Sequence, residues 1–178
     1  MTTPPEVWLR GPLPDVPPLL QPVAHSLLQS REEVAAILPQ LTPRELWREP
    51  GGAASAGYHA RHATGSLDRL FTYARGEELS PAQREVLLTE GKADREEGAP
   101  QRLVAAFAAQ VDRALAQLRA TSESVLTETR FVGRARVPST VIGLLVHAAE
   151  HTQRHVGQLT AITKVVRGTA APAVVSGR

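Results

Sequence analysis

The sequence predicts an all-α protein: a four-helix bundle with an extra short helix and a proline-rich N-terminal arm. Three observations lead to this class. Four long segments repeat apolar residues at spacings of three and four, no segment shows convincing strand alternation, and no repeat of fixed period is present. The 178 residues suffice for one domain with a sizeable core. We expect an extended arm over residues 1–17, the bundle over 18–168 and a frayed tail over 169–178.

The arm is expected to be extended because six of the first eighteen residues are proline. Trp8 and Leu9 are the residues expected to hold it against the bundle. From Pro18 onward, apolar residues recur at helical spacing, which predicts the first long helix. Pro39 and Pro43 are expected to end it.

The second long helix is predicted from Ser55, a good N-cap residue, to about Arg75, with Gly76 as its stop. A short polar helix follows. Its start is marked by the capping box SPAQ at Ser80, and it is expected to end near Thr89 and to be peripheral.

The third long helix is alanine-rich and is predicted to begin at Pro100 and to extend to about residue 120. The stretch 121–138 is looser and has some extended character around Gly133. Ser139 is then expected to cap the longest helix, which runs to about Val166 and ends at Gly168.

Composition excludes several classes of protein. The absence of cysteine rules out disulfide scaffolds, zinc ribbons, iron–sulfur sites and cysteine nucleophiles. The 20 basic and 18 acidic residues are interspersed, so the net charge of +2 does not indicate a nucleic-acid partner. No apolar stretch approaches the roughly 18 residues of a spanning helix, and no signal-peptide pattern is present, so we expect no membrane partner and a cytoplasmic location.

Histidine clustering is the most informative feature of the sequence. Five of the six histidines lie in two groups, one on the second predicted helix (His59, His62) and one on the last (His147, His151, His155). At this histidine frequency, only about 0.007 triplets at i, i+4, i+8 are expected by chance. The three histidines of the last helix share one face and interrupt its core stripe. His25 stands alone, and we interpret it as a packed or capping core histidine.

A metal ion is the simplest partner for imidazoles on a core face, because unpaired polar nitrogens are costly to bury. Histidines four apart can bind one ion, but those eight apart are separated by about 12 Å, so at most two of the three ligate. His59 or His62 would supply a third nitrogen. Three neutral histidines leave open positions, as in catalytic sites. The alternative is a network of hydrogen-bonded core histidines, with Ser66 and Gln158.

Two motifs resemble the DinB-like (YfiT-like) metalloproteins: RHATGSLDRLFTYARG at 61–76 and HAAEHTQRHVGQ at 147–158. This resemblance implies a four-helix bundle, often a homodimer, with bound nickel or zinc, and several branches of the family use low-molecular-weight thiols. The family pattern takes one histidine from the second helix and a His-x-x-x-His pair from the last. Carried over, it implies His62, His151 and His155 as ligands.

Other residues on the same helix faces have candidate roles around the ion. His59, His147 and Gln158 could orient the ligands from behind or serve as alternative ligands, and the additional histidines depart from the family's minimal pattern. Arg69 and Tyr73 share the face of His62 and could orient a substrate, although an ion pair with a neighbouring helix is an equal alternative for Arg69.

Two further residues of the last helix, Glu150 and Gly157, also have candidate roles near the ion. Glu150 points away from His151 and is interpreted as an ion-pair partner or a base beside the ligands rather than a ligand. Gly157, inside the helix, indicates close backbone approach, room near the ion, or packing against a neighbouring helix.

The function hypothesis is a divalent-metal-dependent enzyme that activates a low-molecular-weight thiol, as in a thiol S-transferase, or water. Because the chain has no cysteine, the thiol must come from solution, and the expected partners are a small-molecule thiol or electrophile. The alternative is a non-enzymatic metal or small-ligand binding protein. A homodimer is expected from the family's habit and from the apolar surface around Trp8.

Overall fold

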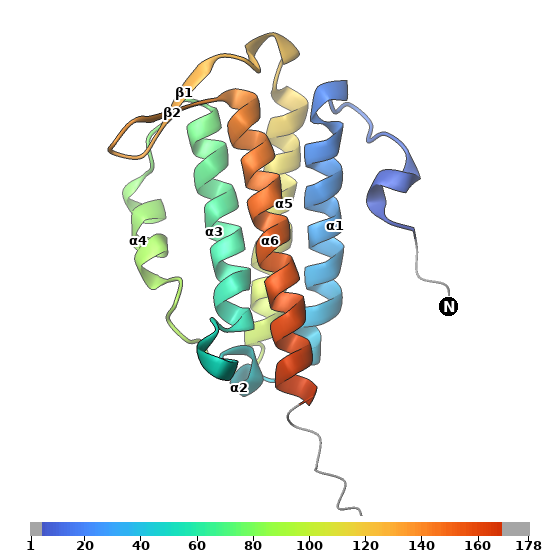
Figure 1. Cartoon of the computed structure of the whole chain (residues 1–178), viewed down its shortest axis with the longest axis vertical. Coiled ribbons are helices and arrows are strands. Elements are labelled where there is room, and N and C mark those ends of the chain that lie inside the picture. Colours follow the sequence, from blue (N-terminus) through green and yellow to red (C-terminus); the bar gives the residue numbers. More distant parts are fainter. Residues whose placement is uncertain (1–4, 169–178) are drawn as a thin grey trace, which may run out of the picture.

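The computed structural model describes residues 5–168 and consists mainly of four long helices (Figure 1). This confirms the all-α prediction. The predicted tail, 169–178, lies outside the described residues. The four helices are α1 (Gln21–Ile37), α3 (Ala56–Ala74), α5 (Ala99–Ala120) and α6 (Val141–Gly168).

The four long helices form a closed ring in which α1 packs on α5 and α6, and α3 packs on the same two helices. The colours of Figure 1 show that α1 and α6 run in one direction and that α3 and α5 run in the other. The most extensive of these contacts joins α3 to α6, the two helices that carry the histidine clusters. Phe71 and Phe107 are among the largest fully buried side chains of the core between the helices.

Two short helices occupy the connections, and both begin with a capping box. α4 (Pro81–Thr89) starts at Ser80 as the sequence indicates, contains no buried residue and lies beside α3 (Figure 1). α2 (Pro43–Leu46) was not expected. Pro43 occupies the first turn of this helix, where a missing N–H costs nothing, and Thr42 accepts the Glu45 backbone N–H.

A β-hairpin between α5 and α6 occupies the stretch around Gly133 for which the sequence indicates some extended character, although no strand alternation is distinct there. β1 (Thr129–Val132) pairs antiparallel with β2 (Val137–Thr140), and Thr129 faces Thr140. Strands of four residues are too short for alternation to be a distinct signal. α6 begins at Val141, so Thr140, which directly precedes it, is the cap instead of Ser139: its Oγ1 accepts the Gly143 N–H at 3.1 Å.

The N-terminal arm also differs from expectation. It contains a 3-10 turn at Val7–Arg10, and Trp8 and Leu9 are 61% and 57% exposed. Val7 and Val16 are the buried residues that hold it. His25 stabilises the arm by a ring-nitrogen contact of 3.1 Å with the Gly11 carbonyl.

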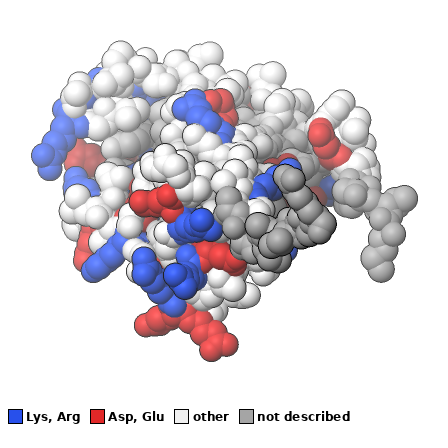
Figure 2. Space-filling view, turned by 60° about the horizontal axis from the view of Figure 1, so that its bottom comes forward, with Lys and Arg blue, Asp and Glu red and all other residues white. Residues whose placement is uncertain are grey.

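The surface of the bundle keeps the mixed charge of the sequence. On the face shown in Figure 2, basic and acidic side chains lie next to one another rather than in separate regions. No helix within residues 5–168 is both long enough and apolar enough to span a bilayer.

Candidate metal centre

Four histidines from α3 and α6 meet inside the bundle, where these two helices pack together. His62 Nε2 lies 3.1 Å from His151 Nε2, and the ring of His155 lies 4.5 Å, centroid to centroid, from each of the other two rings. His62, His151 and His155 each offer a nitrogen, and these three nitrogens lie within 4.8 Å of one another. The three histidines could therefore hold one metal ion.

His59 lies behind this triad. Its Nδ1 is 2.9 Å from His155 Nδ1, and the residue is buried. One of these two nitrogens must donate to the other. If His155 donates, its Nε2 is left with a free lone pair, which is the form that a metal ligand needs.

Glu90 is the residue of the centre that sequence reasoning missed. Its Oε2 lies 2.7 Å from His62 Nδ1, and its Oε1 accepts a hydrogen bond of 2.6 Å from Arg69 Nη1. Both Glu90 and Arg69 are buried, with 3% and 8% of their surface exposed. Arg69 therefore forms the ion pair that the sequence left open, and its guanidinium is held by Glu90 rather than presented to a substrate.

The chain around Glu90 is held by the residue that precedes His62. Arg61 donates hydrogen bonds to the carbonyl oxygens of Thr89 and Lys92, on either side of Glu90. The guanidinium of Arg61 also lies over the ring of Trp47, 4.7 Å from its centroid. This connection between α4 and α5 is thereby fixed against α3, so that Glu90 faces His62.

Gly65 makes room for the Glu90–Arg69 pair. A Cβ at this position would overlap Glu90 Oε1 and would lie 2.7 Å from Arg69 Nη1. Only glycine leaves space on α3 for a carboxylate and a guanidinium to meet one turn above His62. The glycine is thus part of the architecture of the site.

The electrostatics of Glu90 fix the tautomer of His62. Burial alone would raise the pKa of Glu90, but hydrogen bonds from His62 and Arg69, with the charge of Arg69, outweigh burial and leave the pKa below its ordinary value. The ionised carboxylate only accepts hydrogen bonds, so His62 Nδ1 must carry the proton. In neutral His62 the lone pair then lies on Nε2, the nitrogen that faces His151.

The other three histidines of the cluster are neutral near pH 7. Burial, reinforced by the proximity of His62, lowers the pKa of His59, His151 and His155, the last to about 4. Neutral imidazole is the form that binds metal. His151 differs from His62 in that its buried Nδ1 has no hydrogen-bond partner among the described residues.

The spacing of these nitrogens suits a shared ion. Two nitrogens bound tetrahedrally at 2.0–2.1 Å from one zinc ion lie about 3.4 Å apart. His62 Nε2 and His151 Nε2, at 3.1 Å, are close to this value before any ion is placed between them. The residues present therefore fit a divalent cation.

The remaining candidates on α6 are exposed. His147 is exposed and lies 3.4 Å from Glu150, which also pairs with Arg154, so Glu150 is an ion-pair partner as expected. Gln158 is also exposed. A Cβ at Gly157 would meet no atom within 4 Å, so neither close packing nor room for an ion explains this glycine.

Tyr73 lies on α3 eleven residues beyond His62, about 16 Å along the helix axis. It lines a different cavity, formed with α4 and the β-hairpin. Distance along the axis, rather than the angular position on the helix face, separates it from the histidines.

Comparison with known proteins identifies the family of this chain. Residues 26–159 match the family model of the DinB superfamily. The chain belongs to the DinB superfamily. Among solved structures, a crystal structure of a conserved protein from Enterococcus faecalis is similar to this DinB-superfamily protein with a TM-score of 0.66 and 22% identity, covering 84% of this chain and 97% of that one. At that identity the likeness shows the fold. Comparison with curated proteins finds no match.

Proposed function

We propose that this DinB-superfamily protein binds one divalent metal ion, zinc or nickel, through His62, His151 and His155. The observation that carries the proposal is the convergence of three imidazoles whose nitrogens lie within 4.8 Å of one another. Imidazole nitrogen suits both metals. The binding of Glu90 to His62 Nδ1 adds support, because metal-binding histidines commonly donate their other N–H to a carboxylate.

Each residue of the cluster has a distinct part in this proposal. His62, His151 and His155 bind through nitrogen. Glu90 holds the ring of His62 and its proton on Nδ1, and His59 does the same for His155. When bound, the ion would act as a Lewis acid that lowers the pKa of a thiol or water molecule. Three neutral ligands leave its charge uncompensated, which favours an anionic fourth group.

We propose further that the protein is an enzyme for which a low-molecular-weight thiol from solution, or water, is the nucleophile. The missing fourth protein ligand supports this, because open positions are typical of catalytic sites. One observation favours the alternative of a non-enzymatic metal or small-ligand binding protein: Arg69 is engaged by Glu90, and Tyr73 lies elsewhere. Neither is then available at the histidines to orient a substrate.

The metal assignment is tested by the metal content of protein purified without a polyhistidine tag. We expect one ion per chain in wild type and loss of that ion in His62→Ala, His151→Ala and His155→Ala. His147→Ala is the matched control, because it lies on the same face of α6 but is exposed. Folded triad variants that keep the wild-type stoichiometry would contradict the assignment.

The choice between enzyme and binding protein is tested with thiols and an electrophile such as an epoxide. Metal-loaded and metal-stripped protein are compared in the same assay. We expect a faster reaction with the loaded form and a thiol-induced change in the spectrum of the cobalt-substituted protein. Equal rates and an unchanged spectrum would leave the binding protein as the function.

A homodimer and a cytoplasmic location stay predictions. The exposed apolar side chains of Trp8, Leu9 and Leu19 on and beside the arm support a dimer, because pairing would remove them from water. Light scattering at micromolar concentration is the measurement, and a monomeric mass would contradict the dimer.

A further inference from the structure

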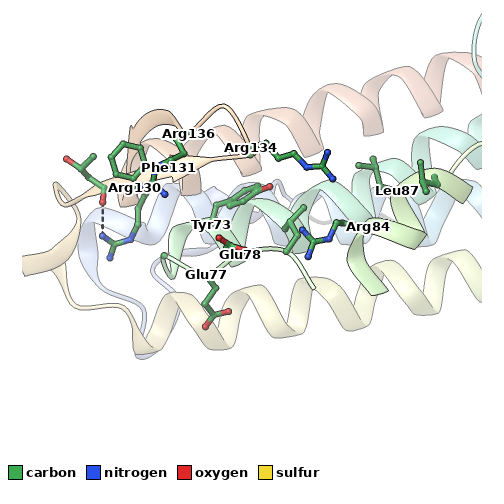
Figure 3. Close-up of a pocket in the computed structure, with 14 residues that line it drawn as sticks. Tyr73, Glu77, Glu78, Arg84, Leu87, Arg130, Phe131, Arg134 and Arg136 are labelled. Atoms are coloured by element: carbon green, nitrogen blue, oxygen red, sulfur yellow. Dashed lines mark hydrogen bonds between the residues drawn. The ribbon is translucent and has the colours of Figure 1, made fainter. Parts of the chain in front are cut away.

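A cavity lies away from the histidines, between α4, the end of α3 and the β-hairpin (Figure 3). Its volume is about 870 Å³. Sites for small organic ligands usually measure about 300–1,000 Å³. The cavity is therefore large enough for a small molecule, and none of the buried histidines lines it.

One part of the cavity wall is apolar and exposed. Leu87 and Leu88, on α4, are 45% and 87% exposed. Phe131, on β1, is 43% exposed and lies at the opposite end of the cavity from Leu87 in Figure 3. Large apolar side chains that face a cavity in this way gain stability when an apolar group covers them. The wall thus suits the apolar part of a ligand.

The other part of the wall carries positive charge. In Figure 3 the guanidinium groups of Arg84 and Arg134 lie near the hydroxyl of Tyr73. Within residues 5–168, neither of these two side chains has a hydrogen bond or ion pair to another residue. They come from α4 and from the hairpin turn, on opposite sides of the tyrosine.

Other charged groups around the cavity are already engaged. Arg130 donates to the Ala74 carbonyl and pairs with Glu128, while Arg136 lies over the ring of Phe131 at 4.3 Å. Glu77, the first acidic residue of the wall, pairs with Arg75.

This leaves one acidic residue, Glu78, against the two unpaired guanidinium groups of Arg84 and Arg134. The excess charge is positive and lies beside an apolar wall. Positive charge next to exposed leucine is complementary to a ligand with an anionic head and an apolar body.

We propose that this cavity binds an amphipathic carboxylate of small-molecule size. The carboxylate binds to Arg84 and Arg134 and accepts the hydroxyl proton of Tyr73 in a hydrogen bond. The apolar chain covers Leu87 and Leu88. The site is separate from the histidines and does not depend on a bound metal.

The test uses the full chain and octanoate as the probe. Isothermal titration calorimetry measures the affinity, and backbone NMR shifts locate the site. We expect octanoate to shift the amide signals of α4 and the hairpin, and we expect neutral octanamide to bind at least tenfold more weakly. The double variant R84Q/R134Q should lower the octanoate affinity at least tenfold. The matched control R44Q/R119Q removes the same charge from positions elsewhere and should keep the wild-type affinity.

Five results would overturn the proposal. Octanoate that does not bind at millimolar concentration excludes the site, and equal affinity for octanoate and octanamide excludes the role of charge. Shifts that map to other elements, or equal losses in R84Q/R134Q and R44Q/R119Q, exclude the assigned arginines. If L87S/L88S instead converts a dimer into a monomer without changing octanoate binding, a second copy of the chain is the occupant.

Discussion

Glu90 Oε2 lies 2.7 Å from His62 Nδ1, and this contact joins a polar connection of the chain to the centre of the helix bundle. Glu90 is nearly inaccessible to solvent and also forms an ion pair with Arg69. A buried carboxylate between an imidazole and a guanidinium is acceptable only because both of its oxygens are bound. The contact thus fixes the ring of His62 and its proton together.

Replacing Glu90 with glutamine should weaken metal binding by about 10- to 100-fold, because the amide lacks the charge that holds the proton on His62 Nδ1. Arg69 would also lose its buried counter-charge, which lowers stability by an amount on the order of 3–5 kcal/mol. Chelator competition measures the affinity, and histidine ¹⁵N shifts report the tautomer. E78Q, at a glutamate far from the histidines, is the control. An unchanged affinity and tautomer would show that Glu90 does not orient His62.

Replacing Gly65 with alanine should displace Glu90 and Arg69, since the new methyl group overlaps Glu90 Oε1. Alanine is the better helix former, but the steric cost in this buried region is larger, and we expect a net loss of about 1–2 kcal/mol. Urea unfolding measures the stability, and the same variant should bind metal less tightly. A stabilised variant with normal metal affinity would exclude this role of the glycine.

Replacing Gly157 with alanine should have the opposite effect. This glycine is exposed, and a Cβ there meets no atom within 4 Å. Helix propensity alone then acts, and the variant should gain up to about 1 kcal/mol. Thermal unfolding of the metal-free protein is the measurement, and a loss of stability would indicate a neighbour, such as a second copy, at this position.

The metal-free protein should lose stability as the pH falls from about 6.5 to about 4. Burial and nearby charge lower the pKa of His155 to about 4 in the folded chain, from an ordinary value of 6.5. Between these values the unfolded chain binds more protons than the folded chain. The stability that neutral His155 contributes is therefore complete above pH 6.5 and is lost as the pH approaches 4. H155Q should flatten this part of the profile, whereas H147Q should keep it. A wild-type profile that does not slope here would contradict the shift.

Local signals predicted much of the fold. Ser55 and Ser80 cap α3 and α4 as expected, and Gly76 follows α3 with the positive φ of a helix stop. Tertiary contacts decided the rest. The hairpin continues through Thr140, so α6 begins at Val141 and its cap is Thr140 instead of Ser139. The burial of Val7 rather than Trp8 depends on how the arm meets α1, which no local pattern encodes.

The candidate site was predictable where it depends on helical spacing. His151 and His155 share a face at i, i+4, and the structure places both beside His62. Glu90 was not predictable from its own surroundings, because it stands among several acidic residues of one polar connection. The residue that could have indicated Glu90 was Arg69, because an arginine on the inner face of a helix requires a buried carboxylate somewhere in the chain.

The histidines that meet in the bundle are far apart in sequence: His62 and His151 are separated by 89 positions, and His59 and His155 by 96. An unfolded chain rarely brings such residues together, so it offers an ion no comparable set of ligands. A metal that binds at this centre would therefore select the native state. Its stabilising effect should grow with the free metal concentration by about 1.4 kcal/mol per tenfold increase above the dissociation constant. The melting temperature of this protein would then report the metal supply of its surroundings.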